Sequence, residues 1–141
     1  MRLGKAPAYA ILAVLDISRN QSGGPVQGRL IAEHHGIPAE YLLKVLQLLV
    51  KAKVLESETG RRGGFTMRRT PSDTTILELI EAVEGPLEGS VSLGAQFPDK
   101  HPLNKAIKGV CQEVAGFARE RWRNVSVADW AALLPEPVGS H

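Results

Sequence analysis

The stretch from Ile31 to Arg69, which reads IAEHHGIPAEYLLKVLQLLVKAKVLESETGRRGGFTMRR, decides the fold. Its pattern predicts a short helix, a tight turn at Gly36-Ile37-Pro38, a second helix, and two strands joined by a basic, glycine-rich turn. A helix-turn-helix followed by a cationic hairpin is typical of a winged helix, which suits one helix to a DNA major groove and the hairpin to the adjacent backbone. The stretch therefore favours a DNA-binding protein over an enzyme.

Three helices are predicted in the N-terminal part of the chain. An apolar run predicts a largely buried helix over 8–18. A shorter helix over 26–35 is followed by Gly36, which suits the left-handed position at a helix end. The third helix starts at Pro38. Its apolar side is predicted to consist of Tyr41, Leu42, Val45, Leu46, Leu48 and Leu49.

The wing is predicted as two short strands over 54–58 and 65–69. In the turn between them, Gly60, Gly63 and Gly64 permit the positive φ values that a hairpin tip needs. The wing thus presents its basic residues at an exposed tip.

After the wing, the pattern predicts a helix capped by Thr74 or Thr75 that ends at Gly85. Residues 86–101 have no clear period and are interpreted as a loop. A long helix follows from Pro102, and its apolar residues recur at spacings of four and three, as in a heptad seam. Such a seam needs a partner surface, from the first domain or from a second copy. The seam residues are Leu103, Ile107, Val110, Val114 and Phe117.

The expected fold class is mainly α with a small β-hairpin, a winged helix-turn-helix followed by a long C-terminal helix. The predicted organisation is a winged helix-turn-helix domain over 1–85 and a loop over 86–101. The long helix and a short last helix, begun by Ser126, occupy 102–134, and a tail covers 135–141.

The composition of the chain limits which other classes of protein it could belong to. The 141 residues are 43% hydrophobic and 23% charged, which is ordinary for a globular protein. No apolar run approaches the roughly 18 residues that span a bilayer, and no signal peptide is recognisable. We therefore expect a cytoplasmic protein with no membrane partner. The single cysteine, Cys111, excludes an intrachain disulfide.

Charge is unevenly distributed along the chain. Residues 1–70 hold 11 Lys and Arg against 5 Asp and Glu, a net charge of +6. Residues 71–141 hold 6 against 10, a net charge of −4. Because the basic half coincides with the helix-turn-helix, it has the expected electrostatic footprint of a phosphate-binding surface.

The third helix is predicted to reach base edges from its first two turns, through Ala39, Glu40, Tyr41 and Lys44. Lys44 can donate to guanine acceptors or to a phosphate, and the alternative is a solvated charge. Tyr41 can donate to a phosphate, and the alternative is packing against the first helix.

Basic residues elsewhere extend this predicted surface. Arg61 and Arg62 lie between glycines at the wing tip, where a packing role is small and a narrow minor groove attracts arginine. The second strand adds Arg68 and Arg69, either as supporting contacts or as plain surface residues. Further phosphate contacts are expected from Arg2, Lys5 and Tyr9.

The chain resembles the Rrf-two family, bacterial winged-helix repressors that include the iron–sulfur cluster assembly regulator. The resemblance implies a homodimer joined through the long helix and bound to an imperfect palindrome in double-stranded DNA. It covers nearly the whole chain. It rests on Met1-Arg2-Leu3, Tyr9-Ala10, Ile31-Ala32-Glu33, Gly36-Ile37-Pro38, Tyr41-Leu42, Lys51-Ala52, the glycine wing, the run from Ile80 to Leu87, and the run from Val125 to Trp130.

This sequence departs from the family pattern at several positions, and these departures change which cluster ligands and DNA contacts are expected. Sensing members carry three cysteines in the loop before the long helix, and these ligate an iron–sulfur cluster; here the loop has none. His101 occupies a position where some members have a histidine ligand, but Pro98 stands where the nearby cysteine would be. We therefore predict no cofactor and interpret His101 as a helix-entry residue. Ala8 replaces a frequent arginine, and Leu43 replaces a frequent glutamate that helps to read bases.

Several alternatives stay open on the sequence. Cys111 is interpreted as a small buried hydrophobe, with a redox-sensing role as the alternative. His34 and His35 suit the C-terminus of their helix and are not interpreted as a zinc site. No nucleophile motif is present, so no enzyme is predicted. The prediction is a homodimeric repressor, with a small-molecule or protein effector left open and a winged-helix protein-interaction module as the rival.

Overall fold

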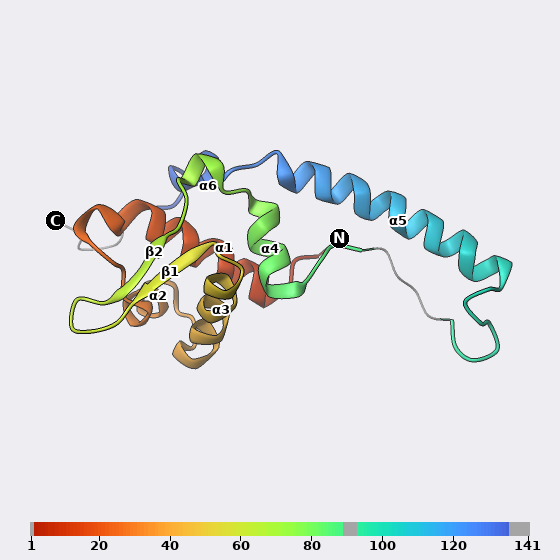
Figure 1. Cartoon of the computed structure of the whole chain (residues 1–141), viewed down its shortest axis with the longest axis horizontal. Coiled ribbons are helices and arrows are strands. Elements are labelled where there is room, and N and C mark those ends of the chain that lie inside the picture. The colour runs from red at the N-terminus through yellow and green to blue at the C-terminus, as the bar shows by residue number, and fades with distance from the viewer. Residues whose placement is uncertain (1, 89–92, 136–141) are drawn as a thin grey trace.

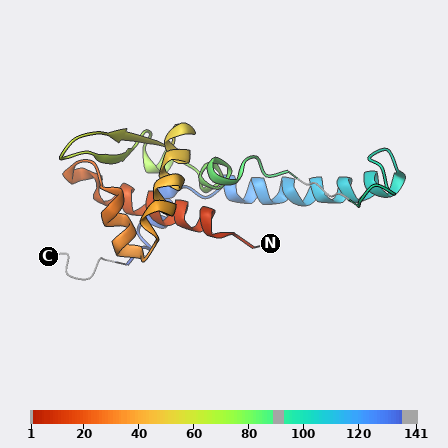
Figure 2. The same cartoon turned by 90° about the horizontal axis from the view of Figure 1, so that it is seen from below.

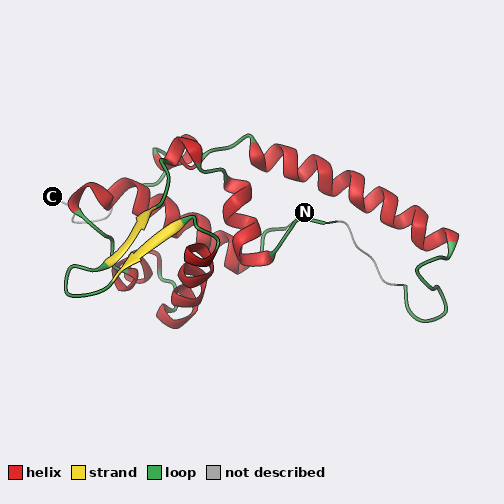
Figure 3. Cartoon of the chain, in the orientation of Figure 1, coloured by secondary structure: helices red, strands yellow, loops and turns green. Residues whose placement is uncertain are grey.

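The computed structural model describes residues 2–88 and 93–135 (Figure 1). A group of short helices and a two-stranded wing forms one end of the molecule, and a long helix extends away from it (Figures 1 and 2). The mainly helical fold with a small hairpin confirms the predicted fold class (Figure 3). The elements in order are α1 (Lys5–Asn20), η1 (Gln21–Gly23), α2 (Gly28–His35), α3 (Ala39–Lys51), β1 (Leu55–Glu58), β2 (Gly64–Met67), η2 (Pro71–Asp73), α4 (Ile76–Glu84), α5 (Pro102–Arg123) and α6 (Val127–Ala131).

Helix α1 lies at the centre of the core and packs against α3, α4 and α6. The run of apolar residues in α1 is buried on several sides for this reason. Burying one such aliphatic side chain contributes roughly 1.5–3 kcal/mol relative to leaving it exposed. The largest fully buried side chains come from α1, α2, α3, α4, α6 and the first strand region: Val14, Ile17, Ile31, Leu42, Leu46, Leu49, Val54, Leu55, Ile76, Leu79, Ile80 and Val127.

The turn between α2 and α3 has the predicted chemistry. Gly36 adopts a left-handed conformation with φ of 63° and ends α2. Ile37 then donates its backbone N–H to the carbonyl oxygen of Ala32 at 3.0 Å, and its side chain is buried. The buried Ile37 side chain fixes the direction in which α3 leaves the turn, so this short segment sets the angle between the two helices.

The wing pairs β1 with β2 antiparallel, from Leu55 opposite Met67 to Glu58 opposite Gly64. Val26, expected inside a helix, instead forms a bridge with Phe65 through two backbone hydrogen bonds of 2.8 and 2.9 Å. These bonds hold Val26 extended, so α2 begins only at Gly28.

The expected role of the wing glycines was wrong at one position. Gly60 and Gly64 have positive φ, of 104° and 150°, but Gly63 does not. Gly63 is needed for space, because a Cβ there would lie 2.3 Å from the carbonyl oxygen of Glu58. The turn therefore folds back on the end of β1.

Helices α4 and α6 begin in the same way and next to each other. Thr75 caps α4 in a capping box with Glu78, and Ser126 caps α6 in a capping box with Asp129. The two capping residues form a β-bridge, so the chain after α5 returns to the core. Val127 is fully buried there.

The apolar residues of the predicted seam lie along α5 and are open to solvent. Four of them are between 44% and 79% exposed, and Ile107 is half-buried. His101 caps this helix, since its Nδ1 accepts the backbone N–H of Leu103 at 3.1 Å, as expected of a helix-entry residue. Part of the predicted loop (89–92) and nearly all of the predicted tail (136–141) lie outside the described residues. No helix in the described part of the chain is long and apolar enough to cross a membrane.

Candidate nucleic-acid interface

Helix α3 has one face in the core and one open to solvent. Leu42, Val45, Leu46 and Leu49 are buried. Tyr41 and Leu48 were expected on this apolar side, but each is 39% exposed, because both lie at its edge. All four residues predicted to reach base edges are exposed, namely Ala39, Glu40, Tyr41 and Lys44. Leu43, which occupies the position where the family often has a base-reading glutamate, is exposed as well, and the structure adds Gln47.

Tyr41 packs on Tyr9 of α1. The two rings meet edge to face, with centroids 5.4 Å apart and planes at 88°. Tyr9 is half-buried, so this contact holds Tyr41 against the body of the protein. The packing alternative is therefore present in the structure, while the remaining exposure leaves Tyr41 at the edge of the open face.

Arg61 and Arg62 are exposed at the tip of the wing, as predicted. They line a crevice of about 520 Å³ with residues 23–25 and Gln27, which belong to the segment between α1 and α2. Neither arginine forms a hydrogen bond or ion pair within the described residues. Two unneutralised guanidinium groups beside a crevice can bind an anion such as a DNA phosphate.

Strand β2 ends at Met67 rather than at the predicted residue 69, and the two arginines that follow it differ from each other. Arg68 is exposed, in keeping with the predicted contact. Arg69 holds the start of α4, because its guanidinium bonds Glu78 Oε1 at 2.6 Å and the carbonyl oxygen of Asp73 at 2.9 Å. The guanidinium of Arg69 is therefore engaged in contacts within the protein, whereas Arg68 is available to a ligand.

Arg2 and Lys5 are exposed near the start of α1. This end of the helix lies near α4 and away from the wing tip (Figure 1). Lys5 lies one helical turn before Tyr9, which packs on Tyr41 of α3, so this end of α1 adjoins α3. The phosphate contacts of Arg2 and Lys5 stay a prediction.

One basic residue of this surface was missed by the sequence reasoning. Arg29 in α2 lines an apolar hollow of about 330 Å³ together with Ala39, Leu43 and Phe65. Its guanidinium is 3.7 Å from Glu33, and both side chains are largely exposed. The sequence places Arg29 near the start of the helix that precedes α3, which could have marked it as a candidate DNA contact. Only the fold shows that Arg29 lies beside α3.

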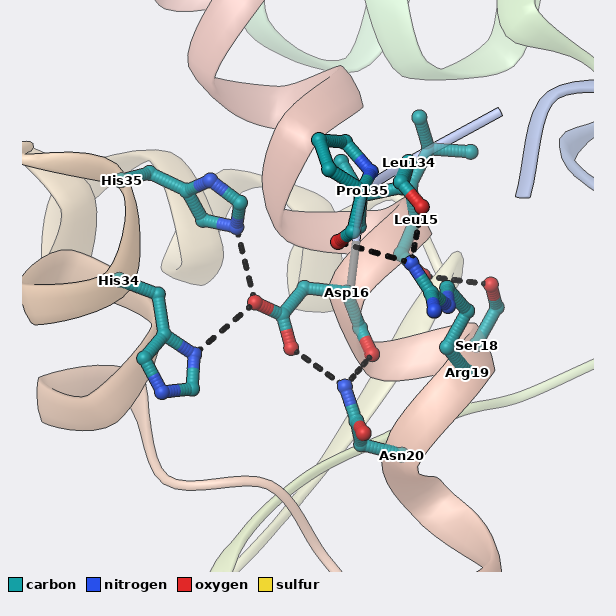
Figure 4. A network of polar contacts seen from close by, with 9 residues as sticks. All are labelled: Leu15, Asp16, Ser18, Arg19, Asn20, His34, His35, Leu134 and Pro135. Atoms are coloured by element: carbon teal, nitrogen blue, oxygen red, sulfur yellow. Dashed lines mark hydrogen bonds and ion pairs between the residues drawn. The ribbon is translucent and has the colours of Figure 1, made fainter. Parts of the chain in front are cut away.

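A buried carboxylate fastens the helix-turn-helix to α1 (Figure 4). Asp16 is 3% exposed, and its Oδ2 accepts from His35 Nε2 at 2.8 Å and lies 3.5 Å from His34 Nδ1. Its Oδ1 accepts from the side chain of Asn20 at 2.8 Å. His34 and His35 end α2, as predicted, and the structure shows that they are directed at Asp16. In the same view, Arg19 donates to the carbonyl oxygens of two residues after α6, Leu134 and Pro135.

A helix-turn-helix followed by a two-stranded wing with a free pair of arginines defines the class of protein, a winged-helix DNA-binding protein. Residues 3–132 match the model of the Rrf2 family, described as an iron-dependent transcriptional regulator. The chain belongs to this family, which is the Rrf-two family that its sequence resembles. It is a DNA-binding transcriptional regulator.

Individual relatives agree with this assignment. The chain is 30% identical over 134 residues to a Rhodopseudomonas palustris protein named as the HTH-type regulator BadM, covering 95% of this chain and 83% of that protein. It is 32% identical over 120 residues to the HTH-type transcriptional regulator IscR of Escherichia coli, covering 83% and 74%. The structure of CymR, the global cysteine regulator of B. subtilis, has the same fold, with a TM-score of 0.75, 18% identity and coverage of 96% and 99%.

The residues present do not fit the iron–sulfur cluster that the family implies. Cys111 is the only cysteine and lies half-buried in α5. His101 uses its Nδ1 to cap the same helix. Across residues 2–88 and 93–135, no group of three His, Cys, Asp or Glu side chains is arranged to hold a metal ion. A cluster needs about four such ligands, so this chain alone does not supply them.

Proposed function

We propose that the protein is a homodimeric repressor that binds an imperfect palindrome in double-stranded DNA without an iron–sulfur cluster. The observation that carries the proposal is a helix-turn-helix with an exposed face on α3, followed by a wing whose free Arg61 and Arg62 lie beside the segment that leads into α2. In this arrangement α3 enters the major groove and supplies base contacts. The wing arginines contact the backbone or the adjacent minor groove.

The exposed seam of α5 supports the dimer. Apolar side chains such as Val110, Val114 and Phe117 are 60% to 79% exposed in one chain. A stripe of this kind is stable in water when a second copy covers it. Two copies related by a two-fold axis would present their α3 helices to successive major grooves about 34 Å apart, which is why the operator should be a palindrome.

The proposal is tested by the salt dependence of DNA binding. We expect the protein to bind a fragment from upstream of its own gene selectively, with an affinity that falls steeply as salt increases. An Arg61→Ala/Arg62→Ala variant removes four cations from a dimer. If all four contact phosphates, the slope of log K against log[salt] should become shallower by about 3 to 4. Fluorescence anisotropy over a salt series measures both slopes.

The matched control is Arg121→Ala/Arg123→Ala, which removes the same charge from exposed positions at the end of α5. We expect this control to leave the slope within about one unit of the wild type, since the DNA-facing surface is intact. If the wing variant and the control behaved alike, the wing would not be a DNA contact, and a protein-binding role for this surface would replace the proposal.

Repression itself is tested by transcription in vitro from the same upstream fragment. Addition of the dimer should lower the yield of transcript in proportion to operator occupancy. An increase in transcript would identify an activator that uses the same DNA surface.

A further inference from the structure

Leu43 is exposed on the DNA-facing side of α3. Its side chain is 49% exposed, although the neighbouring leucines at 42, 46 and 49 are buried in the core. Its neighbours on the open face include Glu40, Lys44 and Gln47, which are also exposed. A large apolar side chain among polar residues on this face contributes neither to solubility nor to the core, which favours a contact in the bound state.

The surroundings of Leu43 are apolar as well. It follows Ala39 by one helical turn, so the two side chains lie on one ridge of α3. Both line the hollow of about 330 Å³ between α2, α3 and β2, with Phe65 on the opposite side. The first part of the recognition helix therefore presents an apolar strip, bordered by Arg29, next to its polar face.

The chemistry of the major groove decides what such a strip can recognise. Guanine, cytosine and adenine present only hydrogen-bonding groups there, whereas thymine also presents its C5 methyl group. A leucine side chain neither donates nor accepts hydrogen bonds. It can therefore distinguish bases only by packing on that methyl group or by excluding a polar edge.

We propose that Leu43, with Ala39 beside it, packs on the C5 methyl group of a thymine in each half-site and so selects a T·A base pair at that position. The inference rests on the proposed DNA binding by α3. Removing one buried methyl group should weaken binding about fourfold, and removing it from both half-sites about fifteenfold.

The experiment replaces thymine by uracil, which keeps every hydrogen-bonding group and removes only the C5 methyl. Duplexes are first enriched from a randomised library by the wild-type protein, and uracil is then substituted singly at each thymine of the enriched site. We expect one symmetry-related pair of thymines at which uracil weakens binding about fourfold each. Leu43→Ala changes both half-sites of the dimer, so it should weaken binding to the thymine duplex by about fifteenfold or more and should no longer respond to uracil there.

Leu48→Ala is the matched control, because Leu48 is an exposed leucine of the same helix that lies away from the ridge of Leu43. It should retain the full response to uracil. Thermal unfolding followed by circular dichroism verifies that both variants are folded. Since Leu43 is half-exposed, we expect its variant to unfold within a few degrees of the wild type.

The outcomes distinguish failure of the Leu43 contact from failure of DNA binding. If a site is enriched but no uracil weakens binding, or if Leu43→Ala responds to uracil as the wild type does, the Leu43 inference is overturned and DNA binding stands. If no sequence is enriched, the proposed sequence-specific binding fails, and the inference fails with it.

Discussion

Asp16 is a buried acid whose partners all lie on α1 and α2. It accepts from His35 and Asn20 and lies near His34, so its removal leaves these groups without their acceptor inside the fold. Unpaired buried polar groups cost about 1–3 kcal/mol each. We expect Asp16→Ala to lower the free energy of unfolding by about 2–3 kcal/mol, measured by urea denaturation.

Glu33→Ala is the control for that experiment. Glu33 also belongs to α2 and pairs with a cation, but its pair with Arg29 is largely exposed. We expect a change of no more than about 0.5 kcal/mol. Equal effects of the two substitutions would show that the Asp16 network does not stabilise the protein.

Gly63 supplies a second prediction at this scale. A Cβ at this position would collide with the backbone of Glu58, which cannot move without opening the wing. We expect Gly63→Ala to destabilise the protein by about 1–3 kcal/mol and to weaken DNA binding through the displaced wing tip. Gly23→Ala is the control, since a Cβ there meets nothing within 4 Å. Urea denaturation and anisotropy measure the two effects, and a wing variant as stable as the control would contradict the prediction.

Single residues were predictable from the sequence where the reason was local. Arg61 and Arg62 could be placed at an exposed tip because glycines flank them. Asp16 could not be interpreted, because its partner His35 is 19 positions away and on another helix. Gly63 was assigned a positive φ because sequence alone does not distinguish a glycine needed for its torsion angle from one needed for space.

Among the elements, α6 and α5 carry valines with opposite expected roles. Val127 of α6 is fully buried in the core, whereas Val114 of α5 is 61% exposed on the seam. We expect Val127→Ala to lower the free energy of unfolding by about 2 kcal/mol while leaving dimer association unchanged. Val114→Ala should weaken association and leave the core intact. Urea denaturation and sedimentation equilibrium separate the two, and a shared response would contradict this division.

Element boundaries were predicted well where a capping residue marks them. Ser126 caps α6, as the sequence indicated, and α4 is capped by Thr75, one of the two candidates, Thr74 and Thr75, that the sequence left open. The start of α2 was predicted too early because Val26 pairs with Phe65, a contact between distant segments that overrides local helix preference. The return of α6 to α1 was also not predicted, since a short amphipathic helix does not specify which surface it covers.

At the scale of the whole molecule, the seam of α5 should determine the oligomeric state. Phe117 is 79% exposed in one chain and central to the proposed interface. We expect Phe117→Glu to shift the protein to a monomer in sedimentation velocity, because it places two carboxylates in an apolar contact. The affinity for a palindromic operator should fall by at least tenfold, since the two half-sites are no longer bound together.

Gln112→Glu provides the matched control for this variant. Gln112 is exposed on the side of α5 opposite the seam, so the same charge is added away from the proposed interface. The control should remain a dimer with nearly unchanged operator affinity. A dimeric Phe117→Glu protein would place the interface elsewhere on the molecule.

The β-bridge between Thr75 and Ser126 has a consequence for biosynthesis. Because Val127 completes the core around α1, the N-terminal segment that carries the helix-turn-helix lacks a core side chain until most of the chain has been made. A nascent chain that has emerged from the ribosome only as far as α4 should therefore stay partly open, with apolar surface available to chaperones and proteases. We therefore expect the helix-turn-helix to complete its folding only after α6 has emerged.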